Sequence, residues 1–252
     1  MSATTYLPTA RKKTAPKAGA SRNRHREADF TALPVLQEYY QALFQAHGSQ
    51  HWWPARTRFE VIVGAILTQN TSWSNVERAL AGLRHEKLLN PAALARIQEA
   101  KLAQLIRSSG YFRQKARKLK AFVHFLNQVY GGSLVRMFRA RTDLLRAQLL
   151  EVHGIGPETA DSILLYAGGH PVFVVDAYTR RILERHHLAD GRESYERIRQ
   201  TFEQNLPPSA SLFNEYHALI VRTGKHFCRT RKPLCDGCAL KPFLPAPAEP
   251  TL

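Results

Sequence analysis

Apolar residues recur at the spacing of an α-helix along most of the chain from about residue 35 onward. Residues 35–47 show the pattern clearly, because their large apolar side chains fall on one helical face and Gly48 then ends the segment. The apolar positions of this face are Leu36, Tyr39, Tyr40, Leu43 and Phe44. The periodicity predicts a helix that packs one side against a core.

The segment FEVIVGAIL, residues 59–67, allows two interpretations. Its length and its β-branched residues suit a buried strand as well as a buried helix. No other part of the chain shows the alternating pattern of partner strands, so we predict a helix. Further helices are predicted for residues 73–84, 91–97, 102–108, 114–129, 142–152, 157–167, 177–187, 194–205 and 211–225. Together they predict an all-α protein of two helical lobes, with the chemistry carried by loops.

The charge of the chain points to a polyanionic partner. Its 252 residues carry 36 Lys and Arg against 20 Asp and Glu, a formal net charge of +16. Nucleic acid is the simplest such partner. An acidic membrane surface and plain solubility are the alternatives. No stretch reaches the roughly eighteen apolar residues of a membrane span, so we predict no membrane partner.

Part of this charge lies in residues 1–30, which are rich in small and polar residues and contain few large apolar ones before Phe30. Such a composition cannot bury enough surface to fold, so we predict a disordered basic arm. An organellar transit peptide is the alternative, but Pro8 and Pro16 interrupt any amphipathic helix. The basic residues of the arm are Arg11, Lys12, Lys13, Lys17, Arg22, Arg24 and Arg26.

A glycine-flanked turn, Gly154-Ile155-Gly156, precedes Pro157, which suits the first turn of a helix. Glycines let backbone N–H groups approach a ligand closely, and a helix N-terminus adds partial positive charge. The pattern therefore suits binding of a phosphate group. A glycine turn between helices is also often just a turn.

Five segments in register resemble the endonuclease III superfamily of DNA glycosylases, the HhH-GPD proteins. They are FEVIVGAILTQNTSW, YFRQKARKLK, LLEVHGIGPETADSILLYAGG, PVFVVDAYTRRI and CRTRKPLCDGC. The resemblance covers residues 35–240 and implies an active site in the cleft between two lobes. It implies a six-helix barrel lobe with the hairpin at about 60–170, a second lobe from 31–58 and 171–240 that ends in a cysteine loop, and a Pro-rich tail at 241–252.

The resemblance also implies roles for individual residues. Asp176 matches the catalytic aspartate, and because it precedes a predicted helix it also suits an N-cap. Gln69, otherwise an ordinary loop residue, matches the glutamine that fills the space left when a base is flipped out of the duplex. The hairpin implies contacts to the DNA backbone from Gly154, Ile155, Gly156 and Thr159.

Glu158 stands where bifunctional members of the family have a lysine, two positions after Gly156. The lysine amine attacks C1′ of the sugar and permits strand cleavage through a Schiff base. A carboxylate cannot form this imine. We therefore expect a monofunctional glycosylase that uses water as its nucleophile.

The three tryptophans of the chain lie near the predicted first core helix, in HWWPARTRFEVIVGAILTQNTSW. This segment resembles the branch of the family that excises 3-methyladenine. That likeness implies a base pocket formed by Trp52, Trp53, Pro54, Trp73 and the late Lys225. Aromatic faces attract a cationic methylated purine by about 1–2 kcal/mol when desolvated. Tryptophans of the ordinary core are the alternative, above all Trp52.

The C-terminal cysteines match the family's iron–sulfur loop only in part. Cys228, Cys235 and Cys238 have its C-x6-C-x2-C spacing, but the fourth position is Leu244. Three interpretations stay open: a degenerate loop, a [4Fe–4S] cluster held by three thiolates and an outside ligand, or zinc completed by a residue such as His226. The 3-methyladenine branch lacks the cluster. Without a secretory signal, three cysteines predict free thiols.

Taken together, these features predict a monomeric base-excision-repair glycosylase that acts on double-stranded DNA containing damaged bases, specifically alkylated purines such as 3-methyladenine. We expect it in the cytoplasm or nucleoid of a bacterium, or in the nucleus or an organelle of a eukaryote. Two alternatives remain. One is a glycosylase/lyase for oxidised pyrimidines in which Lys225 is the nucleophile, and the other is a DNA-binding module without catalysis.

Overall fold

The structure, a computed structural model, describes residues 34–245. This part of the chain is helical and contains no strand, which confirms the predicted all-α fold. The basic arm predicted at 1–30 and the end of the predicted tail, 246–252, lie outside the described residues. Within the described range, every helix is too short or too polar to cross a membrane.

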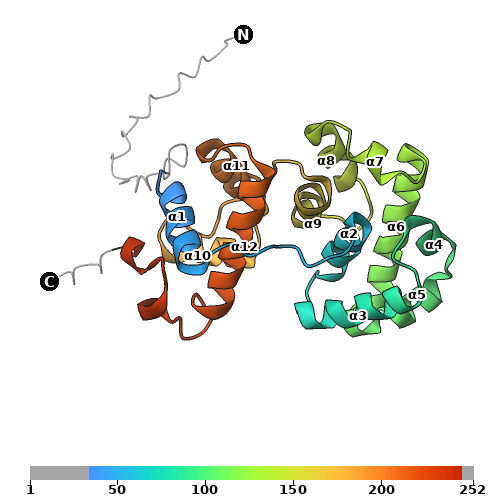
Figure 1. Cartoon of the computed structure of the whole chain (residues 1–252), viewed down its shortest axis with the longest axis horizontal. Coiled ribbons are helices and arrows are strands. Elements are labelled where there is room, and N and C mark those ends of the chain that lie inside the picture. The colour runs from blue at the N-terminus through green and yellow to red at the C-terminus, as the bar shows by residue number, and fades with distance from the viewer. Residues whose placement is uncertain (1–33, 246–252) are drawn as a thin grey trace, which may run out of the picture.

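The helices form two groups, each around its own hydrophobic core (Figure 1). The first group consists of α2 (Arg58–Leu67), α3 (Trp73–His85), α4 (Pro91–Arg96), α5 (Glu99–Leu105), α6 (Phe112–Tyr130), α7 (Leu134–Met137), α8 (Thr142–Leu150) and α9 (Pro157–Ser162). The second consists of α1 (Val35–His47), α10 (Ala177–Arg185), α11 (Tyr195–Asn205) and α12 (Ala210–His226). The other elements are the π-helix η2 (Ile163–Gly168) and the short 3₁₀-helices η1 (Arg107–Ser109), η3 (Cys235–Gly237) and η4 (Lys241–Phe243).

Helix α2 lies inside the first core, and all its residues from Phe59 to Leu67 are buried. A helix buried on every side shows no polar stripe, which explains why its sequence also suited a strand. Its N-terminus is fixed by Thr57, whose hydroxyl accepts a hydrogen bond from the Glu60 N–H at 3.1 Å. The buried Glu60 carboxylate is in turn paired with Arg84.

The C-terminal end of α2 is held by a buried lysine. Lys115, on α6, is 2% exposed and donates hydrogen bonds to the carbonyls of Leu67, at 2.8 Å, and Ser109, at 2.6 Å. Burial, with a smaller contribution from the charge of Lys118, lowers the pKa of Lys115 to about 8. This contact fixes the start of the loop that carries Gln69.

Two differences from the predicted elements have a physical explanation. The predicted helix 157–167 is α9 followed by a π-helix, η2, whose wide turns place Ile163 in the first core and Leu165 in the second. The tail predicted to begin at residue 241 begins later, because the Phe243 ring packs on Tyr39 with centroids 4.9 Å apart.

Ion pairs join the two groups of helices. Arg146, on α8, donates to both carboxylate oxygens of the fully buried Asp161, at 2.7 and 3.0 Å. It also donates to Glu196 on α11 at 2.6 Å, and Arg199 contacts both Glu196 and Glu203. Charge-assisted, bidentate geometry of this kind fixes orientation, so the network holds the two sides of the cleft in register.

Candidate active site

A cleft of about 860 Å³ lies between the two groups of helices and is lined by residues of both. It brings together most of the residues predicted for the site: Trp52, Trp53, Gln69, Trp73, Gly154, Ile155, Gly156, Glu158, Thr159, Asp176 and Lys225. Pro54 is exposed and lies outside the residues that line the cleft. The cleft also contains residues that the sequence did not single out: Lys118, Tyr166, Tyr178 and His217.

Asp176 is the N-cap of α10. Its Oδ1 accepts hydrogen bonds from the Thr179 backbone N–H, at 2.8 Å, and from the Thr179 hydroxyl, at 3.0 Å. Its Oδ2 lies 3.6 Å from Nε2 of His217. One carboxylate oxygen therefore fixes the side chain at the helix terminus, and the other remains available to the cleft. Capping and a role in chemistry are compatible at this residue.

Behind Asp176 lies a buried polar chain. The Tyr166 hydroxyl is hydrogen-bonded to Nδ1 of His217, a histidine that is only 5% exposed. Burial raises the pKa of Tyr166 and lowers that of His217, although the charge of Asp176 opposes the latter shift. A neutral tyrosine donates to Nδ1, so the proton of the neutral imidazole sits on Nε2 and faces Asp176. The pair places a neutral imidazole beside the carboxylate, 3.6 Å from Oδ2 and so beyond hydrogen-bond distance.

Tyr166 lies within the segment LLEVHGIGPETADSILLYAGG, where nothing marks it as a site residue, and His217 lies inside a helical pattern outside the five segments. A histidine among apolar residues of a predicted helix was the available signal for His217. The structure places both in the candidate site beside Asp176.

Glu158 lies on the first turn of α9, where it remains exposed in the cleft. Burial of its carboxyl against the cleft wall and the nearby charge of Asp176 raise the pKa of Glu158 to about 7, although Arg180 acts in the opposite direction. Two carboxylates of like charge thus share one site. Glu158 retains a proton at far higher pH than an ordinary glutamate does.

The tryptophans form an aromatic wall around Trp53. Its ring centroid lies 5.1 Å from that of Trp73 and 5.0 Å from that of Tyr166, and Trp52 lies 5.6 Å away. The exposed Lys225 ammonium lies 5.7 Å from the centroid of the Trp52 ring. All three tryptophans are half-buried, so they are neither pure core nor free surface. Such a wall suits stacking of a planar, electron-poor ligand.

The two hairpin glycines have different roles. Gly154 has φ +80°, and a Cβ there would meet the Lys118 side chain at 2.4 Å, so glycine is required by the fold itself. Gly156 has φ −93°, and a Cβ there would meet no atom within 4 Å. Nothing inside the protein therefore requires glycine at 156, and its open face is free for a ligand.

Gln69 is tied to the hairpin. Its amide donates to the Gly154 carbonyl, at 3.1 Å, and to the Thr159 hydroxyl, at 2.9 Å, and its own carbonyl accepts from Lys118. Thr159 is 7% exposed, and Ile155 is buried with its N–H bonded to the Val152 carbonyl at 3.0 Å. Of the predicted backbone-binding residues, Gly156 is thus the exposed one and Gly154 is half-buried. A wedge role for Gln69 would require its hydrogen bonds to break.

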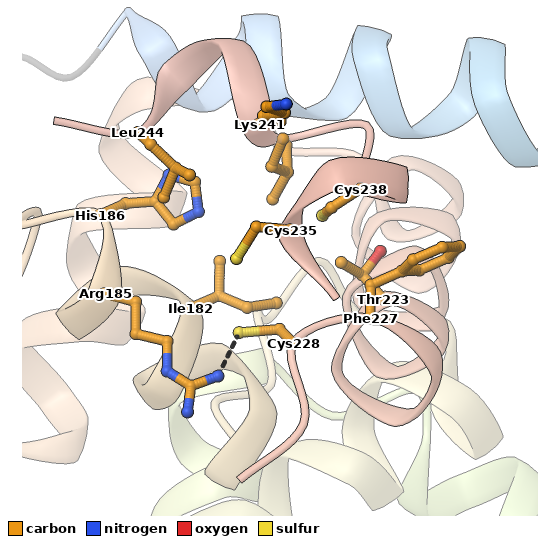
Figure 2. A pocket seen from close by; sticks show the side chains of 11 residues that line it. Ile182, Arg185, His186, Thr223, Phe227, Cys228, Cys235, Cys238, Lys241 and Leu244 are labelled. Atoms are coloured by element: carbon orange, nitrogen blue, oxygen red, sulfur yellow. Dashed lines mark hydrogen bonds between the residues drawn. The ribbon is translucent and has the colours of Figure 1, made fainter. Parts of the chain in front are cut away.

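The three cysteines lie away from the cleft, where they line a second pocket beside α10 (Figure 2). All three are free thiols. His226, the residue expected to complete a zinc site, is exposed and does not line this pocket. Among residues 34–245, no three His, Cys, Asp or Glu side chains are placed to hold one metal ion. The structure therefore gives no support to zinc bound with His226.

The all-α fold thus places a glycine hairpin, a helix-capping aspartate and an aromatic wall around one cleft. Residues 63–208 match the family described as HhH-GPD superfamily base excision DNA repair protein, and the chain belongs to this family.

Three known proteins illustrate the relationship. A protein of Methanocaldococcus jannaschii, whose name describes an inferred DNA repair glycosylase, is 47% identical over 83% of this chain and 95% of its own length. Endonuclease III of Thermotoga maritima is 30% identical over 73% of this chain and 80% of its own. The 3-methyladenine DNA glycosylase of H. pylori, solved with 1,N6-ethenoadenine, shows 29% identity and a TM-score of 0.66, over 76% of this chain and 95% of its own.

These relationships confirm the family that the motifs indicated, with its DNA glycosylase activity and its DNA partner. The roles assigned to individual residues remain predictions.

Proposed function

We propose that the protein is a monofunctional DNA glycosylase that hydrolyses the glycosidic bond of alkylated purines, such as 3-methyladenine, and acts as a monomer on damaged duplex DNA. The observation that carries the proposal is Glu158 in the cleft, in the place of the family's lysine nucleophile. A carboxylate there cannot form a Schiff base with C1′. The lyase step should therefore be absent.

Asp176 supplies the charge that the reaction needs. As the bond between C1′ and the base nitrogen breaks, the electron pair leaves with the base and positive charge develops on the sugar. A carboxylate fixed by Thr179 and backed by His217 would stabilise that charge without reorganisation. Water then adds its oxygen to C1′ and its proton passes to the solvent, which completes the hydrolysis.

The aromatic wall supports alkylated purines as the substrates. A 3-methylated purine nucleoside is cationic, so stacking on Trp53 and Trp73 would favour it over an unmodified base. Its positive charge also makes it a good leaving group without strong acid catalysis. The similarity to the H. pylori 3-methyladenine glycosylase points the same way.

Base release from defined duplexes tests the proposal. We expect free 3-methyladenine from alkylated DNA, intact abasic sites that break only after added alkali, and no covalent adduct with borohydride. Strand cleavage on duplexes with oxidised pyrimidines, with a trapped adduct that disappears in Lys225→Ala, would instead make the protein a glycosylase/lyase. DNA binding without release of any base would support the non-catalytic alternative.

A further inference from the structure

A buried histidine and a tyrosine lie beside Asp176 in the cleft. His217 is on α12 and Tyr166 is in η2, and both residues line the cleft. A π-helix such as η2 is rare in proteins and often marks a functional site. His217 is only 5% exposed, so each of its ring nitrogens is expected to have a hydrogen-bond partner.

One ring nitrogen of His217 is paired inside the protein and the other is not. Nδ1 is hydrogen-bonded to the Tyr166 hydroxyl, whose only partner among the described residues is this nitrogen. Because a buried hydroxyl proton needs an acceptor, Tyr166 donates to Nδ1, and the ring proton sits on Nε2. In the described part of the chain this buried Nε2–H has no hydrogen-bond partner. It is therefore a donor that is available to a molecule in the cleft.

This N–H lies beside the free oxygen of Asp176. Oδ1 of Asp176 is occupied by Thr179, whereas Oδ2 lies 3.6 Å from Nε2 of His217. The separation is too long for a direct hydrogen bond, but it fits two groups that share one water molecule. Both residues line the cleft of about 860 Å³, which has room for water. A water between them would accept from the Nε2–H and donate to Oδ2, and so would pair both groups.

A water in this position has what hydrolysis requires. The Nε2–H binds one lone pair of the water oxygen and Oδ2 accepts one of its protons, so the second lone pair has a fixed direction. The same carboxylate stabilises the positive charge on the sugar, which places the water beside C1′ as that charge develops. The oxygen then bonds to C1′, the O–H bond directed at Oδ2 breaks, and the proton passes through the carboxylate to the solvent. The electron pair of the glycosidic bond leaves with the base.

We infer that His217 and Asp176 together hold the attacking water, which bridges Nε2 of the histidine and Oδ2 of the carboxylate, and that Tyr166 fixes the histidine ring for this role. Burial lowers the pKa of His217, although the charge of Asp176 acts in the opposite direction. A neutral ring supplies a donor to the water without cancelling the charge of Asp176. The inference rests on the hydrolytic function proposed above, because a lysine nucleophile would need no such water.

Two amide substitutions in the full chain separate this role from a structural one. Glutamine places its amide N–H close to the position of Nε2, whereas asparagine places its amide near Nδ1, beside Tyr166. On duplex DNA that contains 3-methyladenine, His217→Asn should slow single-turnover base release about tenfold, the contribution of one hydrogen bond. His217→Gln should restore most of the rate, and both variants should bind the duplex as tightly as the wild type does. If His217 only paired with Tyr166, asparagine would be the better replacement.

His170→Asn is the matched control, because His170 is also buried with an unpartnered Nε2 but does not line the cleft. Its rate of base release should equal that of the wild type. A full rate in His217→Asn, or a slow rate that asparagine restores better than glutamine, would overturn this inference alone. Strand cleavage by the wild type with a borohydride-trapped adduct would overturn the proposed function as well.

A measurement that needs no His217 variant covers the case in which those variants fail to fold. In protein labelled with ¹⁵N-histidine, the histidine ring whose nitrogen signals change in Tyr166→Phe should carry its proton on Nε2 in the wild type. A proton on Nδ1 alone would leave no donor for the water and would overturn the inference.

Discussion

The two walls of the cleft present different chemical groups to a ligand. The wall from the first group of helices presents backbone at Gly154 and Gly156 and the tethered amide of Gln69. The opposite wall presents the carboxylate of Asp176, fixed by a helix cap and backed by buried His217. Backbone groups bind any phosphate without regard to sequence, whereas a fixed charge acts on one atom of a substrate. Binding and chemistry should therefore be separable by mutation.

The largest effect is expected from Asp176→Asn. Loss of the charge that stabilises the transition state should slow base release by about 10²–10³-fold or more. Asparagine also caps helices well, so the fold and the affinity for DNA should stay close to wild type. Single-turnover base release and a DNA titration on the same preparation measure the two properties. Undiminished turnover would place the chemistry on another residue.

Gly156→Val tests the opposite wall. An added Cβ at this position meets no atom within 4 Å and the φ of Gly156 suits valine, so we expect stability close to wild type, whereas the side chain would occupy the open face of the hairpin. We expect affinity for any duplex to fall about tenfold, roughly 1.4 kcal/mol, together with a weaker dependence on salt. Binding titrations at several salt concentrations measure this.

Gly154→Ala is the matched control, because its positive φ and its contact with Lys118 predict a loss of stability rather than a specific loss of binding. If Gly156→Val weakens binding only to lesion-containing DNA, the hairpin reads bases and not backbone.

Much of the fold could be predicted from the sequence because its helices show clear signals. The predicted helix 35–47 has the bounds of α1, with Gly48 at its end. The signal weakens where a helix is buried all round, as in α2, or is very short, as in α7, which the periodicity did not indicate. It does not reveal the change to π-helix at Ile163, because that change depends on packing against both cores.

The cleft residues that the sequence identified lie in contiguous motifs, whose order along the chain carries the resemblance. Lys118 and Tyr166 also lie in these segments, but the contacts that bring them into the site cross long distances in sequence. His217 and Tyr166 meet from helices far apart in the chain, and Lys118 reaches Gln69 from α6. Only tertiary structure brings such pairs together.

Glu158→Gln tests the electrostatic interaction between Glu158 on one wall and Asp176 on the other. Its effect on the protein should be smaller than those of the two substitutions above. The folded pKa of about 7 lies above the ordinary value of 4.5, so the folded state binds this proton more tightly than the unfolded state. The contribution of Glu158 to stability is therefore complete below about pH 4.5 and is lost as pH rises through 7. Relative to Glu158→Gln, the wild type should become less stable between pH 5 and 8.

Urea unfolding midpoints of the two proteins, measured across that pH range, give the comparison. Because the Glu158 residue is exposed, the change should be modest. If the difference between the two unfolding midpoints does not change with pH, then Asp176 and burial do not raise the pKa of Glu158.

The smallest effect is expected from Glu158→Lys, which places an amine at the position of the family's nucleophile. Burial would lower the pKa of the new lysine, but the charge of Asp176 would raise it, so only part of the amine should be neutral and nucleophilic at pH 8. Position alone also does not orient an amine toward C1′. We expect weak borohydride trapping on DNA with an abasic site, and none in Glu158→Met, which has similar length and no amine. Efficient trapping and strand cleavage by Glu158→Lys would mean that the wall around Asp176 is already arranged for a lysine and that Glu158 alone keeps the enzyme monofunctional.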